Sequence, residues 1–197
     1  SSKIIDLTNV QVRSLTSTQL NNMSSTALQA IETVDIQAMT GDQIKGLNTT
    51  QLNNLLSAQL KALSASQVQA LTSTQLNNLS SSNLVLLETA DVKSLTAAQI
   101  SSLSSTKLNQ LGSAQVKALD NMQLKALTTA QLSGLNTTQA TNLTTTQLQA
   151  LTATQVGALS SSVLQSLSST NIESLSAGQL AGLSTAAMAG INTSKAG

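Results

Sequence analysis

Residues 71–78 read LTSTQLNN, and the same eight letters stand at 15–22. The octad begins with a large apolar residue, numbered position 1 here. Such a residue recurs every eight positions from Leu7 to Leu183 without an insertion or a deletion. A second apolar row lies at position 6, where Ala140 alone is small. A fixed period held over most of a chain is the signature of a repeat architecture.

Each octad carries the signals that start a helix. Thr72 and Gln75, at positions 2 and 5, form a Ser/Thr-x-x-Glu/Gln capping box, and Leu71 and Leu76 stand where a hydrophobic staple places its pair. Ser or Thr holds position 2 in 16 of the 23 units and Gln holds position 5 in 15, so the signal is general. It predicts a helix over positions 3 to 8 of each unit. Leu56 at position 2 has no explanation in this pattern.

Two other structures fit the spacing poorly. A continuous helix turns by about 100° per residue, so a row of period eight would spiral around it and leave no apolar face. Positions 1 and 6 differ by an odd number and would point to opposite faces of a strand. The charges also favour short helices, because acids gather near the predicted helix starts and cations near the ends, as the helix dipole prefers. The acids at positions 2, 4 or 5 are Glu32, Asp35, Asp42, Glu88, Asp91 and Asp120, and the cations at position 7 are Arg13, Lys45, Lys61, Lys93, Lys117 and Lys125.

The sequence therefore predicts an all-α solenoid, a superhelix of one-to-two-turn helices with one helix per octapeptide. One octad buries too little apolar surface to offset the entropy of ordering its backbone, so the units must stack on their neighbours. Small residues at positions 3, 4 and 8 would let the coils approach. We expect a partial repeat at 1–6, an array of 23 repeats at 7–190 and a truncated repeat at 191–197. The recurrence of 15–22 at 71–78, 56 residues later, indicates either two coils of three to four octads or a duplication.

The composition excludes several classes of function. The chain has 197 residues, a formal charge of +1, and no Cys, His, Pro, Trp, Tyr or Phe. It offers no thiol nucleophile, imidazole base or common zinc site, and no aromatic platform for single-stranded nucleic acid. The charge gives no electrostatic footprint for nucleic acid or an anionic membrane, and the longest apolar run, 84–87, is far too short to span a bilayer. We predict no nucleic-acid partner and no membrane insertion.

Several motifs resemble sites. Ser104 and Lys107 share the Ser-x-x-Lys spacing of acyl enzymes, but they also occupy positions 2 and 5, so we interpret Ser104 as a helix cap. The acids at 32–42 and 88–91 could hold a hard cation, yet they lack a calcium-loop pattern and fit first-turn positions. The Asn-x-Ser/Thr triplets follow from the repeat itself and lie at Asn22, Asn48, Asn78, Asn136, Asn142 and Asn192. The position-7 cations are too widely spaced to bind nucleic acid. The Ser/Thr row at position 2 could bind ice or a crystalline polymer, but helix capping already accounts for it. We predict no catalytic, cofactor-binding or metal-binding residue, and no cofactor.

Residues 143–159, LTTTQLQALTATQVGAL, resemble the Leu-Thr-x-x-Gln-Val-x-Ala octapeptide tracts of large bacterial surface and adhesin-like proteins. The resemblance covers nearly the whole chain. It implies an extracellular or cell-surface, array-forming protein and brings no catalytic residues.

These patterns favour a structural role over an enzyme. We expect a rod, spacer or filament segment of a secreted or surface protein, whose partners are neighbouring repeats or further copies of itself, joined end to end or laterally. The open ends at 1–6 and 192–197 carry no polar capping module, which indicates a piece of a longer array or end-to-end assembly. The alternative is an adhesin-type module that binds a surface or protein ligand through the outer face of the superhelix.

Overall fold

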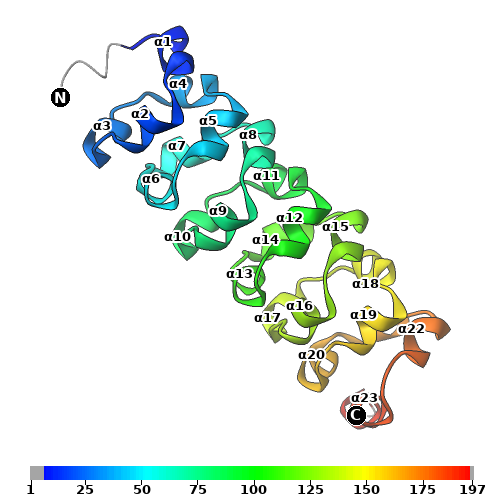
Figure 1. The fold of residues 1–197 in the computed structure, drawn as a ribbon. Helices are drawn as coiled ribbons and strands as arrows, with labels where there is room; N and C mark the ends of the chain where they lie inside the picture. The colour runs from blue at the N-terminus through cyan, green and yellow to red at the C-terminus, as the bar shows by residue number, and fades with distance from the viewer. Residues whose placement is uncertain (1–6, 196–197) are drawn as a thin grey trace. The chain divides into compact units, whose positions relative to one another are not determined.

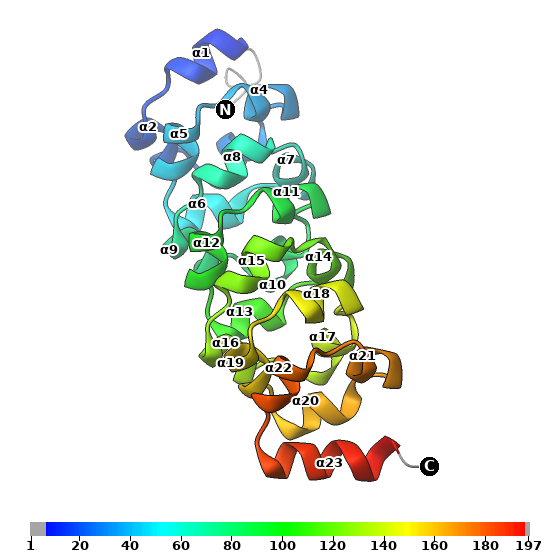
Figure 2. The same cartoon turned by 90° about the vertical axis from the view of Figure 1, so that its right-hand side faces the viewer.

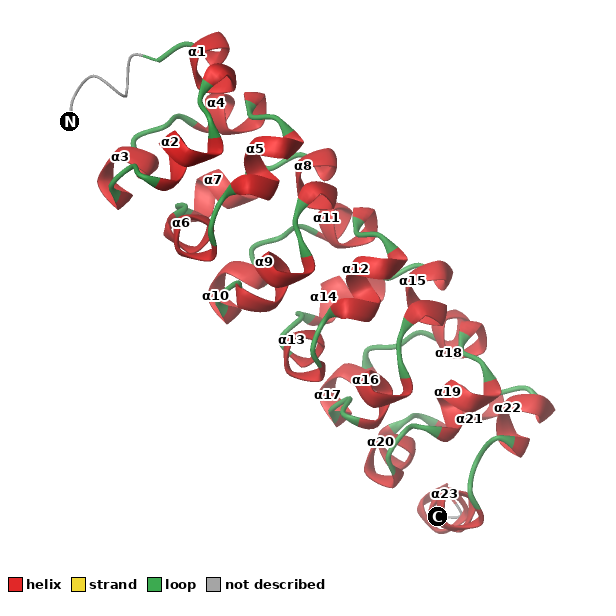
Figure 3. Ribbon diagram, in the orientation of Figure 1, coloured by secondary structure: helices red, strands yellow, loops and turns green. Residues whose placement is uncertain are grey.

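The described part of the chain is helical throughout. A computed structural model describes the backbone of residues 7–195 and the side chains of residues 7–191. It contains 23 helices and no strand within those residues, and successive helices begin eight residues apart (Figure 3). The predicted all-α solenoid with one short helix per octad is therefore confirmed.

The helices fall into two compact units, divided between Leu95 and Thr96. Unit 1 holds α1 (Asn9–Ser14), α2 (Ser17–Asn21), α3 (Ser25–Gln29), α4 (Thr33–Ala38), α5 (Gly41–Gly46), α6 (Thr49–Asn54), α7 (Ser57–Lys61), α8 (Ala65–Ala70), α9 (Ser73–Asn78), α10 (Ser81–Leu84) and α11 (Thr89–Ser94). Unit 2 holds α12 (Ala97–Ser102), α13 (Ser105–Asn109), α14 (Ser113–Ala118), α15 (Asn121–Ala126), α16 (Thr129–Ser133), α17 (Thr137–Thr141), α18 (Thr145–Ala150), α19 (Ala153–Gly157), α20 (Ser161–Ser166), α21 (Ser169–Glu173), α22 (Ala177–Ala181) and α23 (Thr185–Lys195).

The helices break where the octad signals predict. Thr72 is the N-cap of α9, with an extended backbone at φ −76° and ψ 159°. Its hydroxyl accepts a hydrogen bond from Gln75 N at 3.1 Å, and Gln75 Oε1 accepts from Thr72 N at 2.8 Å. Leu79 is also extended and ends the helix, so a link of about two residues turns the chain toward the next one. Each octad therefore forms one short capped helix followed by a two-residue link, which lets the chain change direction at every repeat.

Within each unit, the chain returns to its own neighbourhood after three to four helices (Figures 1 and 2). In unit 1, α1 packs against α4 and α5 against α8; in unit 2, α12 packs against α15 and α20 against α23. Side-chain hydrogen bonds between adjacent coils join residues 28 and 31 apart. One coil thus takes about 28 residues, or three and a half octads. Two such coils make the 56-residue recurrence, so the coil interpretation of that period agrees with the structure.

The two apolar rows pack on opposite faces of each coil. At the N-terminal end, position-6 residues such as Val12 and Leu20 are fully buried, whereas Leu15 and Met23 at position 1 are half-buried. Toward the C-terminal end, Leu175 at position 1 is buried while Ile172 and Leu180 at position 6 are half-buried, and Leu183 at position 1 of the following octad is half-buried too. Position 1 therefore packs toward the preceding coil and position 6 toward the following one.

Small residues set the distance between coils at positions 3 and 8, two of the three positions predicted. A Cβ added to Gly46, at position 8 of α5, would collide with Ser17 at position 3 of α2. A Cβ on Gly182 would likewise collide with the backbone of Ala153. Both pairs are 29 residues apart, so close helix contact recurs at one register.

Two places depart from the simplest expectation. Leu56 begins α7 without a side-chain cap, and the helix start is instead held by Gln59 Oε1, which accepts from Leu56 N at 2.8 Å. The last helix, α23, continues past Ile191 to Lys195, where we expected a truncated repeat to begin. The physical reason lies in the sequence, because positions 5 and 6 of that octad are Lys195 and Ala196, which supply neither the glutamine nor the large apolar residue of a helix start.

Candidate functional site: a glutamine ladder between coils

The position-5 glutamine makes two sets of hydrogen bonds. In α9, Gln75 Oε1 accepts from the backbone N–H and the hydroxyl of Thr72 at 2.8 and 3.0 Å. Its Nε2 donates to the carbonyl oxygens of Ile44 and Leu47 in the preceding coil, at 2.8 and 2.7 Å. The side chain is only 3% exposed. A single buried carboxamide therefore caps the start of its own helix and hydrogen-bonds to the preceding coil. We call this pair of interactions a rung, and the row of such glutamines the glutamine ladder.

The same rung recurs in both units. In eight octads the carboxamide nitrogen donates to a position-6 carbonyl and a position-1 carbonyl, 31 and 28 residues earlier. In the octads of Gln51 and Gln139 a carbonyl 30 residues earlier takes the place of the first. The glutamines bonded in this way are Gln43, Gln51, Gln59, Gln67 and Gln75 in unit 1, and Gln131, Gln139, Gln147, Gln155 and Gln179 in unit 2. Because every rung joins nearest coils only, the interaction can be repeated along the array without change.

A second row of amides joins the coils at their outer edge. Asn21 at position 7 donates from Nδ2 to Gly46 O at 2.8 Å and accepts from Asn48 N at 2.8 Å through Oδ1. Since Asn48 N is taken by Asn21, the buried Oε1 of Gln51 has no partner among the described residues. Asn109 and Asn136 repeat this arrangement in unit 2 and leave Gln139 Oε1 in the same state.

Asp91 replaces the glutamine of α11. It is 6% exposed and accepts from Glu88 N at 2.9 Å, so it keeps the capping half of the rung. A carboxylate cannot donate. The spacing of the other rungs, 31 and 28 residues, would give a glutamine at this position the carbonyls of Leu60 and Leu63 as acceptors. Burial raises the pKa of the Asp91 carboxyl, the hydrogen bond from Glu88 N lowers it, and the nearby Glu88 carboxylate raises it further. The net direction is upward, as expected for an acid at a site built for a donor.

The Ser-x-x-Lys motif forms a helix cap. Ser104 Oγ accepts from Lys107 N at 3.1 Å at the start of α13, as interpreted from the sequence. The Lys107 ammonium donates to Gln110 Oε1 at 3.0 Å. The hydrogen bond from Lys107 N to Ser104 Oγ accounts for the spacing of the motif by helix capping.

The acidic clusters lie at helix starts. Glu32 and Glu88 are N-cap residues, while Asp35, Asp42 and Asp91 lie in first turns. Among the described residues no three acids come together in a group that could hold a metal ion.

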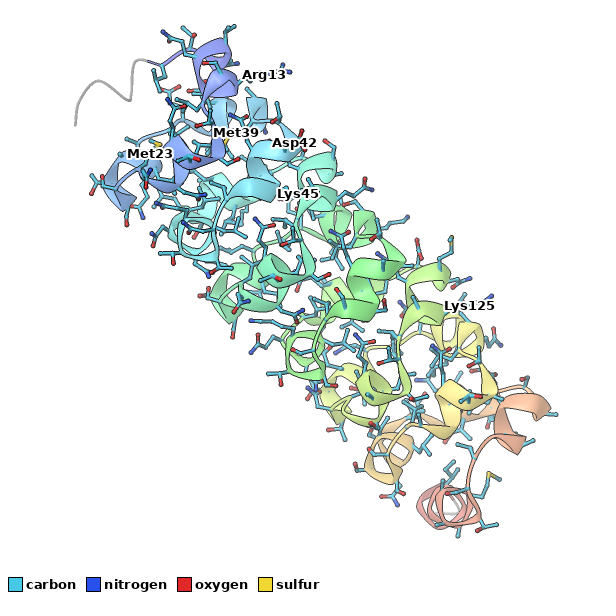
Figure 4. All side chains as sticks on the ribbon, viewed as in Figure 1. Arg13, Met23, Met39, Asp42, Lys45 and Lys125 are labelled. Carbon is cyan, nitrogen blue, oxygen red and sulfur yellow. The ribbon has the colours of Figure 1, made fainter. Side chains whose placement is uncertain are left out.

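The remaining sequence candidates lie on the surface. Arg13, Asp42, Lys45 and Lys125 lie at the outer side of their helices, and Figure 4 shows Arg13 and Lys125 projecting away from the ribbon. The asparagines of the Asn-x-Ser/Thr triplets at 22, 48, 78, 136 and 142 are exposed or half-buried, while the side chain of Asn192 lies outside the described residues. No described helix has the length and hydropathy to cross a membrane.

Sequence reasoning assigned the glutamine row to capping and missed its inter-coil half. A signal for it exists in the sequence. Glutamate serves a capping box as well as glutamine does, yet no octad has Glu at position 5. The use of glutamine rather than glutamate indicates that the N–H donors of the carboxamide are needed.

The fold and the ladder define an α-helical repeat protein in which each coil binds the next through main-chain carbonyls. The family model of the ALTTAQ repeat matches residues 28–60, 84–121 and 117–153, which together make up just over half of the chain. The chain belongs to the ALTTAQ repeat family. A search of curated proteins finds no match.

Proposed function

We propose that this chain is a structural segment, a spacer or rod of a secreted or cell-surface protein. The observation that supports the proposal is the glutamine ladder. Its rungs recur in one register and join nearest coils alone, so stability grows with the number of coils rather than with any single contact. Such a segment can be lengthened by whole coils without redesign.

Small-angle X-ray scattering of the isolated chain tests the spacer role. A compact chain of this length has a radius of gyration of about 16 Å. A spacer should exceed that value clearly, and the radius should rise further when two coils, residues 71–126, are duplicated in tandem. A radius that stays near the compact value in both chains would contradict the proposal.

The surface location is tested separately. Antibodies raised against the chain should label intact cells of the source organism, and protease added outside should remove the signal. Labelling only after the cells are opened would contradict a surface role and leave the scattering result unaffected.

A second candidate, binding of a surface or protein ligand by the outer face, is favoured by one feature. Val10, Val34 and Met122, all at position 4, are 77%, 53% and 74% exposed. Val10 and Val34 lie on α1 and α4, which pack side by side in unit 1. Screening on glycan and protein arrays tests this candidate, and loss of a hit in a Val10→Ser/Val34→Ser variant would assign it to this face.

A further inference from the structure

We propose that Asp91 makes the contact between α11 and the preceding coil a pH-operated latch, which is tight when the carboxyl is protonated and loosens when it ionises. We call the contact of α11 with the segment formed by α7 and α8 the α11 seam. The proposal goes beyond the structural role argued above, because it concerns how the coils open and holds wherever the chain is located. It rests on a rung that has an acid in place of its donor.

The α11 seam lacks the inner hydrogen bonds of the ladder. Asp91 Oδ2 accepts from Glu88 N at 2.9 Å, and no described residue donates to Oδ1. The carbonyls that a glutamine would use here belong to Leu60 and Leu63. Leu60 O accepts from Leu63 N at 3.2 Å, and no described side chain donates to either carbonyl. The side chains of Asp91 and Leu63 are 6% and 4% exposed, so these polar groups lie in the interior of unit 1.

A side chain as short as aspartate can reach the preceding coil. Asn83 holds the same position in α10 and, like aspartate, is one methylene shorter than glutamine. Its Nδ2 donates to Asn53 O, 30 residues earlier, at 3.1 Å. A protonated Asp91 has the same length and carries an O–H where asparagine carries its N–H, whereas the carboxylate only accepts. Protonation therefore supplies the donor and removes a buried charge in one step.

Few charged groups surround the seam within unit 1. α8 packs against α11 and contains no ionisable residue. α7 contributes Lys61, and the octad of α11 contributes Glu88 and Lys93; all three side chains are exposed. Burial is the largest cause of the raised pKa of Asp91; the hydrogen bond from Glu88 N lowers the pKa, and the Glu88 carboxylate raises it again.

The direction of the pH response follows from this raised pKa. In an open, solvated seam the Asp91 carboxyl has its ordinary pKa of 3.8, and in the closed seam its pKa is higher. Closing the seam therefore takes up a proton. The seam is tightest below the ordinary pKa and loosens as the pH rises through the raised pKa.

The outer edge of the seam stays joined at every pH. Gln69 Nε2 in α8 donates to Ser94 O at the end of α11, at 2.8 Å, and an amide does not titrate. Ionisation of Asp91 therefore opens the inner side of the seam locally and leaves α11 attached. Val163 also replaces the glutamine in α20, but a valine cannot respond to pH. Asp35 holds this position in α4, where one of the carbonyls that a rung would use, that of residue 4, lies outside the described residues.

Hydrogen exchange at single-amide resolution tests the proposal on the full chain. Val92 N and Leu95 N donate to carbonyls of their own octad at 3.0 and 3.2 Å, so their protection reports the α11 seam. Leu148 and Leu151 hold the same positions 56 residues later, in α18, where Gln147 completes the rung. After correction for the intrinsic pH dependence of exchange, the protection of Val92 and Leu95 relative to this reference pair should be about fivefold higher at pH 4 than at pH 7. That factor is the contribution of one net hydrogen bond.

Three variants assign the response to Asp91. Asp91→Asn keeps the length and donates at every pH, so the relative protection should be high at both pH values and should not change between them. Gln147→Asp places the acid in the reference seam, and the protection of α18 should then fall as the pH rises. Glu88→Gln removes the neighbouring carboxylate and should leave a pH response of the same direction.

Four outcomes would overturn the proposal. The first is a wild-type chain whose relative protection is the same at pH 4 and pH 7. The second is an Asp91→Asn variant that keeps the pH response of the wild type. The third is a Gln147→Asp variant whose α18 amides show no pH response. The fourth is loss of the response in Glu88→Gln, which would assign it to Glu88. None of them bears on the scattering test of the spacer role, which measures the dimensions of the chain.

Discussion

The ladder makes one substitution especially informative, Gln131→Glu in unit 2. Gln131 is 3% exposed and donates to Ile100 O and Leu103 O, each at 2.8 Å. Its Oε1 accepts from Thr128 N at 2.8 Å. Glutamate has the same shape and keeps the capping bond, so the substitution removes the inter-coil donor and little else.

The expected cost follows from protonation. An ionised glutamate at this position would face two carbonyls in a buried site, so the folded protein takes up a proton instead. Holding a glutamate neutral at pH 7 against an unfolded pKa of about 4.3 costs about 3.7 kcal/mol, and the one hydrogen bond still lost adds about 1 kcal/mol. We expect the free energy of unfolding to fall by about 4–5 kcal/mol at pH 7.

The same reasoning predicts how the stability cost of Gln131→Glu changes with pH. The folded pKa of the new carboxyl lies above the unfolded value, so the penalty is small below about pH 4 and grows as the pH rises toward the folded pKa. At pH 4 the protonated acid donates to one carbonyl, and the cost should shrink to about 1–2 kcal/mol.

Gln11→Glu is the matched control. Gln11 has the same position in its octad and the same cap, with Oε1 bonded to Thr8 N, but no described carbonyl receives its Nε2. We expect a change within about 0.5 kcal/mol, because an acid in the first turn suits the helix dipole. Urea unfolding followed by circular dichroism at low protein concentration measures both variants, since the chain has no aromatic residue to report by fluorescence. Equal losses in the two variants, or a Gln131→Glu penalty that persists at pH 4, would refute the inter-coil donor.

Two further predictions concern individual positions. Asp91→Gln should raise the free energy of unfolding by about 1–3 kcal/mol at pH 7, because it restores the donor of a rung and removes a buried acid. Since the pKa of Asp91 is raised in the folded protein, the gain should shrink in acid, where the aspartate is protonated in both the folded and the unfolded state. Urea titrations at pH 4 and pH 7 check this direction. Gly182→Ala should lower the melting temperature by several degrees, because the added Cβ meets the backbone of Ala153. Gly178→Ala in the same octad meets only Ser176 Oγ, at 3.9 Å, and should raise the melting temperature slightly through helix propensity. An equal response at the two glycines would contradict the close contact between coils.

The local structure of this protein could be predicted from its sequence to a large extent. A helix start is predicted by Thr72, Gln75 and the two flanking leucines, and the structure has a capped helix there. The signals are local because a cap involves residues three apart, so no distant contact is needed to interpret them. The same holds at Ser104, where the sequence favoured a cap and the structure has one.

The relation between coils needed the tertiary structure. The period of eight does not state how many octads make a coil, since that number depends on the angle between successive helices. The 28-residue coil, the opposite packing of positions 1 and 6, and the second role of Gln75 all follow from that angle. Only when Ile44 and Leu47 lie beside Gln75 does its nitrogen become an inter-coil donor. The sequence by itself determined the helices and their caps, and tertiary packing decided what each cap residue binds beyond its own octad, because those partners lie some thirty residues away.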